Sequence, residues 1–369
     1  MEMQEILGMN HGEGQFSYAH NSFAIPGKIF THKIKPAVEK AIKYQLLRDI
    51  TKQYKVLNVA DLGSGVGPTP IALLATIMET VHNVYKEMKS ENDDQVPEVQ
   101  IYMSDLPSND FNMLFKDAAK IQGQRRDGMP LCFVIGAPGS FHGRLFSTKS
   151  LHFVHSSSAL HWLSQVPLGV YNEEGMAMNK KSILASETST PEVVESYFAQ
   201  FKSDFTSFLT CRSKEVVTDA YMLLSFPGRG SIKPCQYLFF THLFQAFASL
   251  VSKGVITEEK LDSFNLPIYF PCKEEIEGII SEEGSFIIKN MEVTIEGAAV
   301  DIKDIQLRAE AIAKFLRCTT ETITSYHFGA QIWDLLQPVL QQVILKHLNS
   351  INDPYHIPFL IILLEKKLD

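Results

Sequence analysis

The sequence predicts an α/β protein whose mostly parallel sheet has an antiparallel edge strand and carries an α-helical cap. Short apolar runs bounded by turn residues recur along the chain, and each predicts a buried strand. Segments of helical periodicity separate most of these runs, as in sheets whose parallel strands are joined by crossover helices. Two further apolar runs, 286–295 and 358–365, flank the last helical region and predict strands that return to the sheet.

The first predicted strand, 55–60, leads into the Gly-rich turn 61–68, and a helix follows from Thr69 to about residue 85. Such a turn brings bare backbone against a ligand, because glycine lacks Cβ and can take positive φ. Dinucleotide-binding turns place a third glycine where this chain has Pro68, and here an acid, Asp61, precedes the first glycine instead. The turn therefore favours S-adenosylmethionine over NAD, since Asp61 would attract its cationic sulfonium and amino group.

The second predicted strand, 99–105, ends in Asp105. Doubly wound folds bind ligands at the carboxyl ends of their parallel strands. Asp105 is therefore expected beside the Gly-rich turn, where its carboxylate would hold the ribose hydroxyls. The other elements predicted here are strands at 131–136, 151–156 and 221–226, with helices at 190–212, at 233–252 and over most of 304–348.

Composition and charge restrict the class of protein. The net charge is −8 and no Lys/Arg cluster is present, so neither nucleic acid nor a membrane is expected as a partner. The five cysteines are scattered and lack paired metal spacing, which is typical of a reducing compartment. The acidic start and the lack of a long apolar run predict neither a signal peptide nor a transmembrane helix. We therefore expect a cytoplasmic protein.

No repeat or low-complexity linker divides the chain, so domain boundaries follow the predicted elements. Residues 1–232 are expected to form an N-terminal lid and the core of the ligand-binding α/β domain. The helices within 233–283 and 299–350, together with the helix at 190–212, are expected to cap the carboxyl edge of the sheet. The late strands expected to return to the sheet lie within 284–298 and 351–369.

Several motifs are specific in combination and extend over nearly the whole chain. They are Asp61-Leu62-Gly63, Ser104-Asp105-Leu106-Pro107, Pro138-Gly139-Ser140-Phe141, His161-Trp162-Leu163-Ser164, Asp262-Ser263-Phe264-Asn265 and His327-Phe328-Gly329. With these motifs the chain resembles the plant SABATH methyltransferases, which include carboxyl methyltransferases of salicylate, jasmonate, indole acetate and loganate as well as the caffeine synthases. The resemblance implies a Rossmann-like class I methyltransferase sheet and S-adenosyl-L-methionine as methyl donor.

The resemblance also assigns the donor site. Leu106 and Phe141 would enclose the adenine ring, and Ser140 would make a polar contact near it. The family's usual turn, Asp-Leu-Gly-Cys-Ser-Ser-Gly-Pro-Asn, is altered here to Ser64 at the Cys position and Thr69 at the Asn position, and both can still form hydrogen bonds. The donor-binding residues implied in this way are Tyr18, Ser22, Asp61, Gly63, Ser64, Thr69, Asp105, Leu106, Ser140 and Phe141.

The acceptor site departs further from the family pattern. Many carboxyl-methylating members hold the acceptor carboxylate between a Gln amide and a Trp indole, and the matched residues here are Ile25 and Trp162. Because Ile25 donates no hydrogen bond, a carboxylate would lose a charge-assisted bond worth about 1.5 to 3 kcal/mol. Ser158 stands where the family usually has Tyr, which enlarges the pocket. The acceptor-binding residues implied are Ile25, Ser158, His161, Trp162, Phe239, Phe240 and Ile357.

The resemblance further implies a metal ion and a homodimer, since family members commonly form homodimers. The residues that match the described metal site are Asn179, Asp262, Phe264 and Asn265. Mg²⁺ prefers octahedral oxygen coordination, and a single carboxylate among neutral oxygens suits it poorly. A turn role for Asp262 and Asn265 is therefore the alternative.

Two acceptor chemistries remain open. The leading prediction is O-methylation of a small plant carboxylic acid to its methyl ester, because an acid with a pKa near about 4 arrives ionised and needs no base. The alternative, suggested by Ile25, is N-methylation of an alkaloid ring nitrogen, with His161 accepting a hydrogen bond or a proton. A non-catalytic metabolite-binding pseudoenzyme is a second alternative, suggested by the altered turn. An NAD oxidoreductase comes third, and Pro68 opposes it.

Overall fold

The computed structural model describes residues 6–22, 26–48, 55–88, 96–123, 126–235, 237–297, 299, 301–350 and 355–368. Its strands are β1 (Val56–Leu62), β2 (Glu98–Asp105), β3 (Cys132–Pro138), β4 (Leu151–Ser157), β5 (Val216–Pro227), β6 (Phe286–Gly297) and β7 (His356–Lys366). Its longer helices are α4 (Lys35–Arg48), α5 (Pro68–Met88), α6 (Phe111–Gly123), α7 (Pro191–Glu215), α8 (Leu238–Ser252), α10 (Lys273–Glu283), α11 (Ile305–Phe328) and α12 (Ile332–Ser350). Its short helices are α2 (Tyr18–Asn21), α3 (Pro26–Ile29), η2 (Phe30–Ile34), η3 (Leu168–Val170) and α9 (Glu258–Asp262).

The strands of the described residues form one sheet in the order β3-β2-β1-β4-β5-β7-β6. Neighbours from β3 to β5 are parallel, whereas β7 runs antiparallel to both β5 and β6. The predicted fold class is thus confirmed, with the antiparallel strand lying one place inside the edge formed by β6. Central strands such as β1 have largely apolar sequences because helices cover both faces of the sheet.

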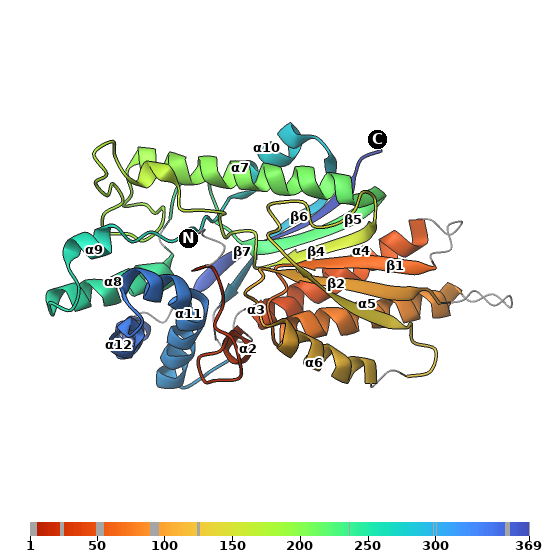
Figure 1. Cartoon of the computed structure of the whole chain (residues 1–369), viewed down its shortest axis with the longest axis horizontal. Coiled ribbons are helices and arrows are strands. Elements are labelled where there is room, and N and C mark those ends of the chain that lie inside the picture. The colour runs from red at the N-terminus through yellow and green to blue at the C-terminus, as the bar shows by residue number, and fades with distance from the viewer. Residues whose placement is uncertain are drawn as a thin grey trace.

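Figure 1 shows α5 and α6 beneath the sheet and α7 and α10 above it. α4 packs against α5 and so lies on the same face as that helix. The lower helices contact β2 to β5, and α7 and α10 contact β5, β6 and each other. Two apolar cores result, one on each face. On the upper face α7 contributes a row of aromatic residues, Tyr197, Phe201, Phe205 and Phe208, all buried. The predicted elements at 99–105, 190–212 and 221–226 are confirmed, while α4 and α6 were not anticipated.

A second group of helices, α8, α9, α11 and α12, lies to one side of the sheet, with α2 against α11 (Figure 1). This group falls within the ranges expected for the cap. α7 and α10 fall in ranges expected for the cap but lie on the sheet, because α10 packs Ile276, Ile279 and Ile280 against α7 and β6. The division of the chain into domains stays a prediction. None of the described helices combines the length and the apolarity needed to span a bilayer.

Candidate active site

The Gly-rich turn after β1 is tied to the end of β2 and to the N-terminal segment. The amide of Gly63 donates to Ser104 O at 2.8 Å. Gly63 has φ +72°, and a Cβ added there would clash with the Cβ of Ala159. Gly67 has φ +97°, and a Cβ there would lie 2.9 Å from Cα of Ala19 in α2. Both positions therefore require glycine, for conformation as well as for space.

Asp105, at the end of β2, forms hydrogen bonds that hold this turn in place. Its Oδ2 accepts from the Gly65 amide at 2.6 Å, and its Oδ1 accepts from the Leu106 amide at 2.7 Å. Burial raises the pKa of Asp105 to about 6, against the opposing effect of these two N–H groups. A carboxylate offers about four lone-pair sites, so Asp105 keeps acceptor capacity for a ligand.

Asp105 opens onto a cavity of about 110 Å³ between the sheet, the N-terminal segment and α11. Sequence reasoning missed the contribution of α11, whose periodicity indicates only an amphipathic helix. It also missed His142, which follows the predicted loop residues. The predicted donor residues that line this cavity are Tyr18, Gly63, Asp105, Leu106, Ser140 and Phe141; lining residues not predicted include His142, Thr319, Thr322 and Ile323.

The other four predicted donor residues lie outside that lining. Asp61 Oδ1 lies 2.8 Å from Nδ1 of His155, and both side chains are buried. The hydroxyls of Ser22, Ser64 and Thr69 are also buried, with no hydrogen-bond partner among the described residues. A buried hydroxyl without a partner costs free energy unless a ligand or water satisfies it. The hydroxyls of Ser64 and Thr69, in the Gly-rich turn, are thus left to bind a polar group of a ligand or water.

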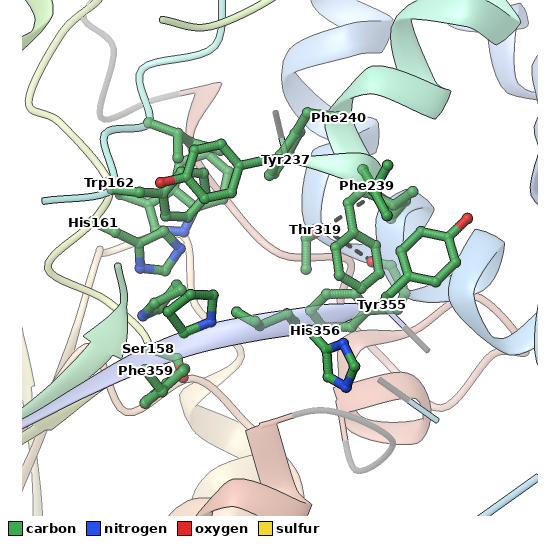
Figure 2. Close-up of a pocket in the computed structure, with 18 of the residues that line it drawn as sticks. Ser158, His161, Trp162, Tyr237, Phe239, Phe240, Thr319, Tyr355, His356 and Phe359 are labelled. Atoms are coloured by element: carbon green, nitrogen blue, oxygen red, sulfur yellow. Dashed lines mark hydrogen bonds between the residues drawn. The ribbon is translucent and has the colours of Figure 1, made fainter. Parts of the chain in front are cut away.

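A second cavity, of about 230 Å³, adjoins the first (Figure 2). Five residues line both cavities, namely Met9, Tyr18, Ser158, Trp162 and Thr319. The predicted acceptor residues that line the second cavity are Ser158, His161, Trp162, Phe239, Phe240 and Ile357, whereas Ile25 lies outside the described residues. The two cavities thus meet at side chains from the N-terminal segment, from the segment after β4 and from α11.

Aromatic rings form most of the second cavity's wall. Figure 2 shows His161, Trp162 and Tyr237 on one side and Phe239 and Tyr355 across from them. Among the described lining residues of both cavities there is no Lys or Arg. The second cavity therefore offers a ligand apolar and aromatic contacts, with no fixed positive charge.

His161 is the titratable group of most interest in this wall. Its ring stacks on Phe270 at 5.7 Å, and its backbone carbonyl accepts from the amide of Tyr269. Burial lowers the pKa of His161 to about 3, so the imidazole is neutral at physiological pH. Its Nδ1 has no hydrogen-bond partner in the part of the chain that the structure describes. His161 can thus bind a neutral polar group.

Ser158 stands at the junction of the cavities in a left-handed conformation, with φ 55°. Its amide donates to Ser225 O of β5 at 2.7 Å. Left-handed residues other than glycine cost free energy and are concentrated at functional sites. The chain then turns at residues 159–162, where the Trp162 amide donates to Ala159 O at 3.0 Å, and Trp162 forms an isolated β-bridge with Ile268.

The predicted metal site does not gather a suitable ligand set. Asn179 Nδ2 donates to Asn265 Oδ1 at 2.8 Å, and Asn179 Oδ1 accepts from Ser189. Both amide oxygens are therefore already engaged. Within the described ranges no three His, Cys, Asp or Glu side chains lie together as a metal site would require. These residues, with Asp262 and Phe264, fit a hydrogen-bonded turn better than Mg²⁺.

Comparison with known proteins decides the family. The profile of the family described as SAM-dependent carboxyl methyltransferase matches residues 4–367. The chain belongs to this family. The SABATH resemblance is thereby confirmed, and the protein is an S-adenosylmethionine-dependent methyltransferase with S-adenosylmethionine as its methyl donor.

Several curated proteins and one solved structure are similar to this methyltransferase over nearly its whole length. Caffeine synthase 1 from Camellia taliensis is 42% identical, with 91% of this chain and 90% of that protein covered. A 3,7-dimethylxanthine N-methyltransferase from Camellia sinensis is 40% identical, with coverages of 95% and 94%. The structure of loganic acid methyltransferase with S-adenosylhomocysteine matches with a TM-score of 0.84 at 30% identity, covering 98% of this chain and 99% of that one.

Proposed function

We propose that this enzyme N-methylates a flat, uncharged nitrogen heterocycle bound in the second cavity. The observation that carries the proposal is the aromatic lining, in which the described residues include neither Lys nor Arg. A carboxylate buried there would lose its hydration without gaining a Lys or Arg partner, whereas a flat neutral ring would bury its faces against aromatic side chains. The similarity to caffeine synthase 1 and to the dimethylxanthine N-methyltransferase supports the same acceptor class.

We place the donor in the first cavity, where it supplies a methyl group already activated on a sulfonium sulfur. Asp105 would accept hydrogen bonds from the ribose hydroxyls. Leu106 and Phe141 would pack on the two faces of the adenine ring, with Ser140 beside it. The SABATH resemblance assigns the polar end of the donor to Ser22, Asp61, Ser64 and Thr69, which lie beyond the lining of this cavity, while Tyr18 and Gly63 line it.

We assign His161 an orienting role. The ring nitrogen forms a bond to the methyl carbon as the sulfonium C–S bond breaks, and the cationic product then loses its N–H proton to solvent. His161 is not the acceptor of this proton, because a group whose pKa is lowered to about 3 is a poor base near neutral pH. A neutral imidazole with an unpaired nitrogen can instead accept or donate a hydrogen bond that fixes the acceptor in line with the methyl group. The wall of rings excludes water and so adds to the rate.

O-methylation of a carboxylic acid is the second candidate. Two observations favour it: the indole of Trp162 lines the junction of both cavities, and the similar solved structure is of a loganic acid methyltransferase. A carboxylate acceptor would also need a second hydrogen-bond donor beside the Trp162 indole. Trp162 alone would leave one carboxylate oxygen without a charge-assisted bond.

Product chemistry separates the two candidates. Purified enzyme is incubated with methyl-labelled donor and a panel of neutral purines, other nitrogen heterocycles and small aromatic acids, and each labelled product is treated with base. We expect label that resists base, on a heterocycle. Base-labile label confined to the acids would overturn the N-methylation proposal in favour of the ester. Asp105→Ala serves as the matched control, since it should abolish labelling of every acceptor.

We further propose that the enzyme is a cytoplasmic homodimer. All five cysteines are free, which suits a reducing compartment. The homodimer is supported by the SABATH resemblance. Size-exclusion chromatography with light scattering tests it, and a monomer at micromolar concentration would contradict it. No step is assigned to Mg²⁺, because the residues at the predicted metal site do not fit it.

A further inference from the structure

The loop that follows β3 carries three residues of the first cavity's wall, Ser140, Phe141 and His142. The loop as far as residue 146 belongs to no strand. Backbone polar groups of a partly buried loop need partners as much as those of a sheet do. Here two side chains near the C-terminal end of α7, Arg212 and Glu215, form hydrogen bonds with four of these backbone groups.

Arg212 holds two carbonyl oxygens of this loop. Its Nη1 donates to Phe141 O at 2.9 Å, and its Nη2 donates to Gly143 O at 2.8 Å. The guanidinium also lies 5.3 Å from the ring of Phe208, which meets the Phe141 ring edge-on at 6.3 Å. Both the backbone and the ring of Phe141 are therefore fixed from α7.

Glu215 holds the other end of the loop. Its Oε1 accepts from the amides of Leu145 and Phe146, at 2.7 Å and 3.1 Å. Its two oxygens also accept from Arg212, at 2.6 Å to Nε and 2.9 Å to Nη2. Arg144, half exposed, lies 3.3 Å from the same carboxylate. The ion pair and the loop backbone thus form one hydrogen-bonded unit.

Both side chains of the pair are 0% exposed. A buried ion pair adds little net stability, and apolar residues of similar volume often replace it without loss. Such a replacement could not serve here, because two carbonyls and two amides would lose their partners. The pair therefore does more than hold α7 to the sheet: it determines the path of the loop along the first cavity.

We propose that Arg212 and Glu215 are positioning residues for the adenine end of the donor site. The inference rests on the placement of the donor in the first cavity under the proposed function. Neither side chain lines that cavity. They act through the loop, by fixing the backbone and the ring of Phe141 in the wall of the first cavity, which Leu106 also lines. Their ligand class is the nucleoside of the donor, and the acceptor does not depend on them.

The test measures binding of S-adenosylhomocysteine by titration calorimetry to Arg212→Met, Arg212→Lys and Glu215→Gln. We expect the dissociation constant to rise about tenfold or more for Arg212→Met, since two charge-assisted bonds to the loop are lost. The dissociation constant of Arg212→Lys should lie between those of Arg212→Met and the unmodified enzyme, because the lysine ammonium keeps the charge but lacks the several N–H donors of a guanidinium. In turnover assays the KM for the donor should rise while the acceptor KM stays within about twofold.

Two variants separate positioning from loss of stability. In Arg212→Met/Glu215→Leu no uncompensated buried charge remains, so thermal stability should exceed that of the single variants. It should stay below that of the unmodified enzyme, because the carbonyls and amides of the loop still lack partners, and donor affinity should stay weak. The matched control is Arg229→Met, which breaks another buried ion pair, with Glu275, away from the first cavity. Arg229→Met should lower stability but leave the dissociation constant of S-adenosylhomocysteine within about twofold.

Each outcome decides the proposal. If donor affinity recovers in the double variant together with stability, or if Arg229→Met weakens donor binding as much as Arg212→Met, the positioning role is refuted. Phe141→Ala distinguishes this failure from failure of the donor placement. Weakened binding in Phe141→Ala with unchanged binding in the Arg212 and Glu215 variants refutes only the inference. Unchanged binding in Phe141→Ala refutes the placement itself.

Discussion

Donor binding should depend on pH through Asp105. Burial raises the pKa of this carboxyl to about 6, and the nearby Asp61 charge acts in the same direction. The ionised form is the one that can accept hydrogen bonds from the ribose hydroxyls while it also accepts from the Gly65 and Leu106 amides. Lowering the pH through 6 protonates Asp105 in the free enzyme, so the donor must displace a proton to bind.

The magnitude follows from this pKa. If only the ionised enzyme binds, the apparent dissociation constant rises by a factor of 1 + 10^(pKa − pH), about 1.1 at pH 7 and about 11 at pH 5. Binding should therefore weaken about tenfold across this interval, which equals about 1.4 kcal/mol. Asp105→Asn removes the titration. It also places an amide NH₂ opposite a backbone N–H, so binding should weaken by about 1.5 to 3 kcal/mol at pH 7.

Titration calorimetry with S-adenosylhomocysteine between pH 5 and pH 8 measures both effects. His161 does not contribute in this range, because burial holds its pKa at about 3. The unmodified enzyme should show the tenfold loss and proton release near pH 6, and Asp105→Asn should show a flat profile. A flat profile in the unmodified enzyme, or Asp105→Asn binding with unchanged affinity at pH 7, would refute the assignment of Asp105 to the ribose.

Three further predictions follow from the same structure. Gly63→Ala should lower the free energy of unfolding by about 3 kcal/mol or more in urea titrations, because of the positive φ at this position and the clash with Ala159. The control is Gly12→Ala, which has a similar φ of 76° but open space around it and should lower the free energy of unfolding by about 1 kcal/mol. Equal losses in the two variants would contradict the steric argument. His161→Leu should lower kcat on a heterocyclic acceptor about five- to tenfold. It should not move any inflection of the pH–rate profile between pH 5 and pH 8, since the lowered pKa keeps the His161 imidazole neutral throughout this range. An inflection that disappears in the variant would show that His161 acts as a base. Dialysis against EDTA should leave both turnover and the midpoint of thermal unfolding unchanged, and a loss reversed by Mg²⁺ would show that the predicted metal site is real.

The site residues that could be predicted from the sequence are those at the ends of strands. A Gly-rich turn after one strand and an acid ending the next must meet if the strands are parallel neighbours, and β1 and β2 are. Gly63 and Asp105 were placed together by that reasoning alone. The acceptor residues came instead from the family resemblance, because an apolar residue in a helix carries no signal that separates core from cavity wall.

The residues that support the site could not be found in the same way. Arg212 is about 70 positions from the loop whose carbonyls it binds. In the sequence of α7, Arg212 resembles any basic residue near the C-terminal end of an amphipathic helix, where positive side chains are common because they interact favourably with the helix dipole. The fully buried position of Arg212 and its fork of donors appear only when helix, loop and sheet are assembled.

The two cavities differ in what builds them, and this difference explains how one scaffold can serve several acceptors. The first is formed largely by backbone in fixed conformations: the turn that needs glycine at Gly63 and Gly67, the amides that Asp105 accepts from, and a loop held by one buried ion pair. A change there disturbs several strands at once. The second is formed by side chains of α8, β7 and the segment after β4, which can change size without moving the backbone. Acceptor choice can therefore change by substitution at positions such as Phe240 and Ile357, which line the second cavity but not the first, while the donor site stays the same. Replacing either side chain should alter the acceptor KM but not the affinity for S-adenosylhomocysteine.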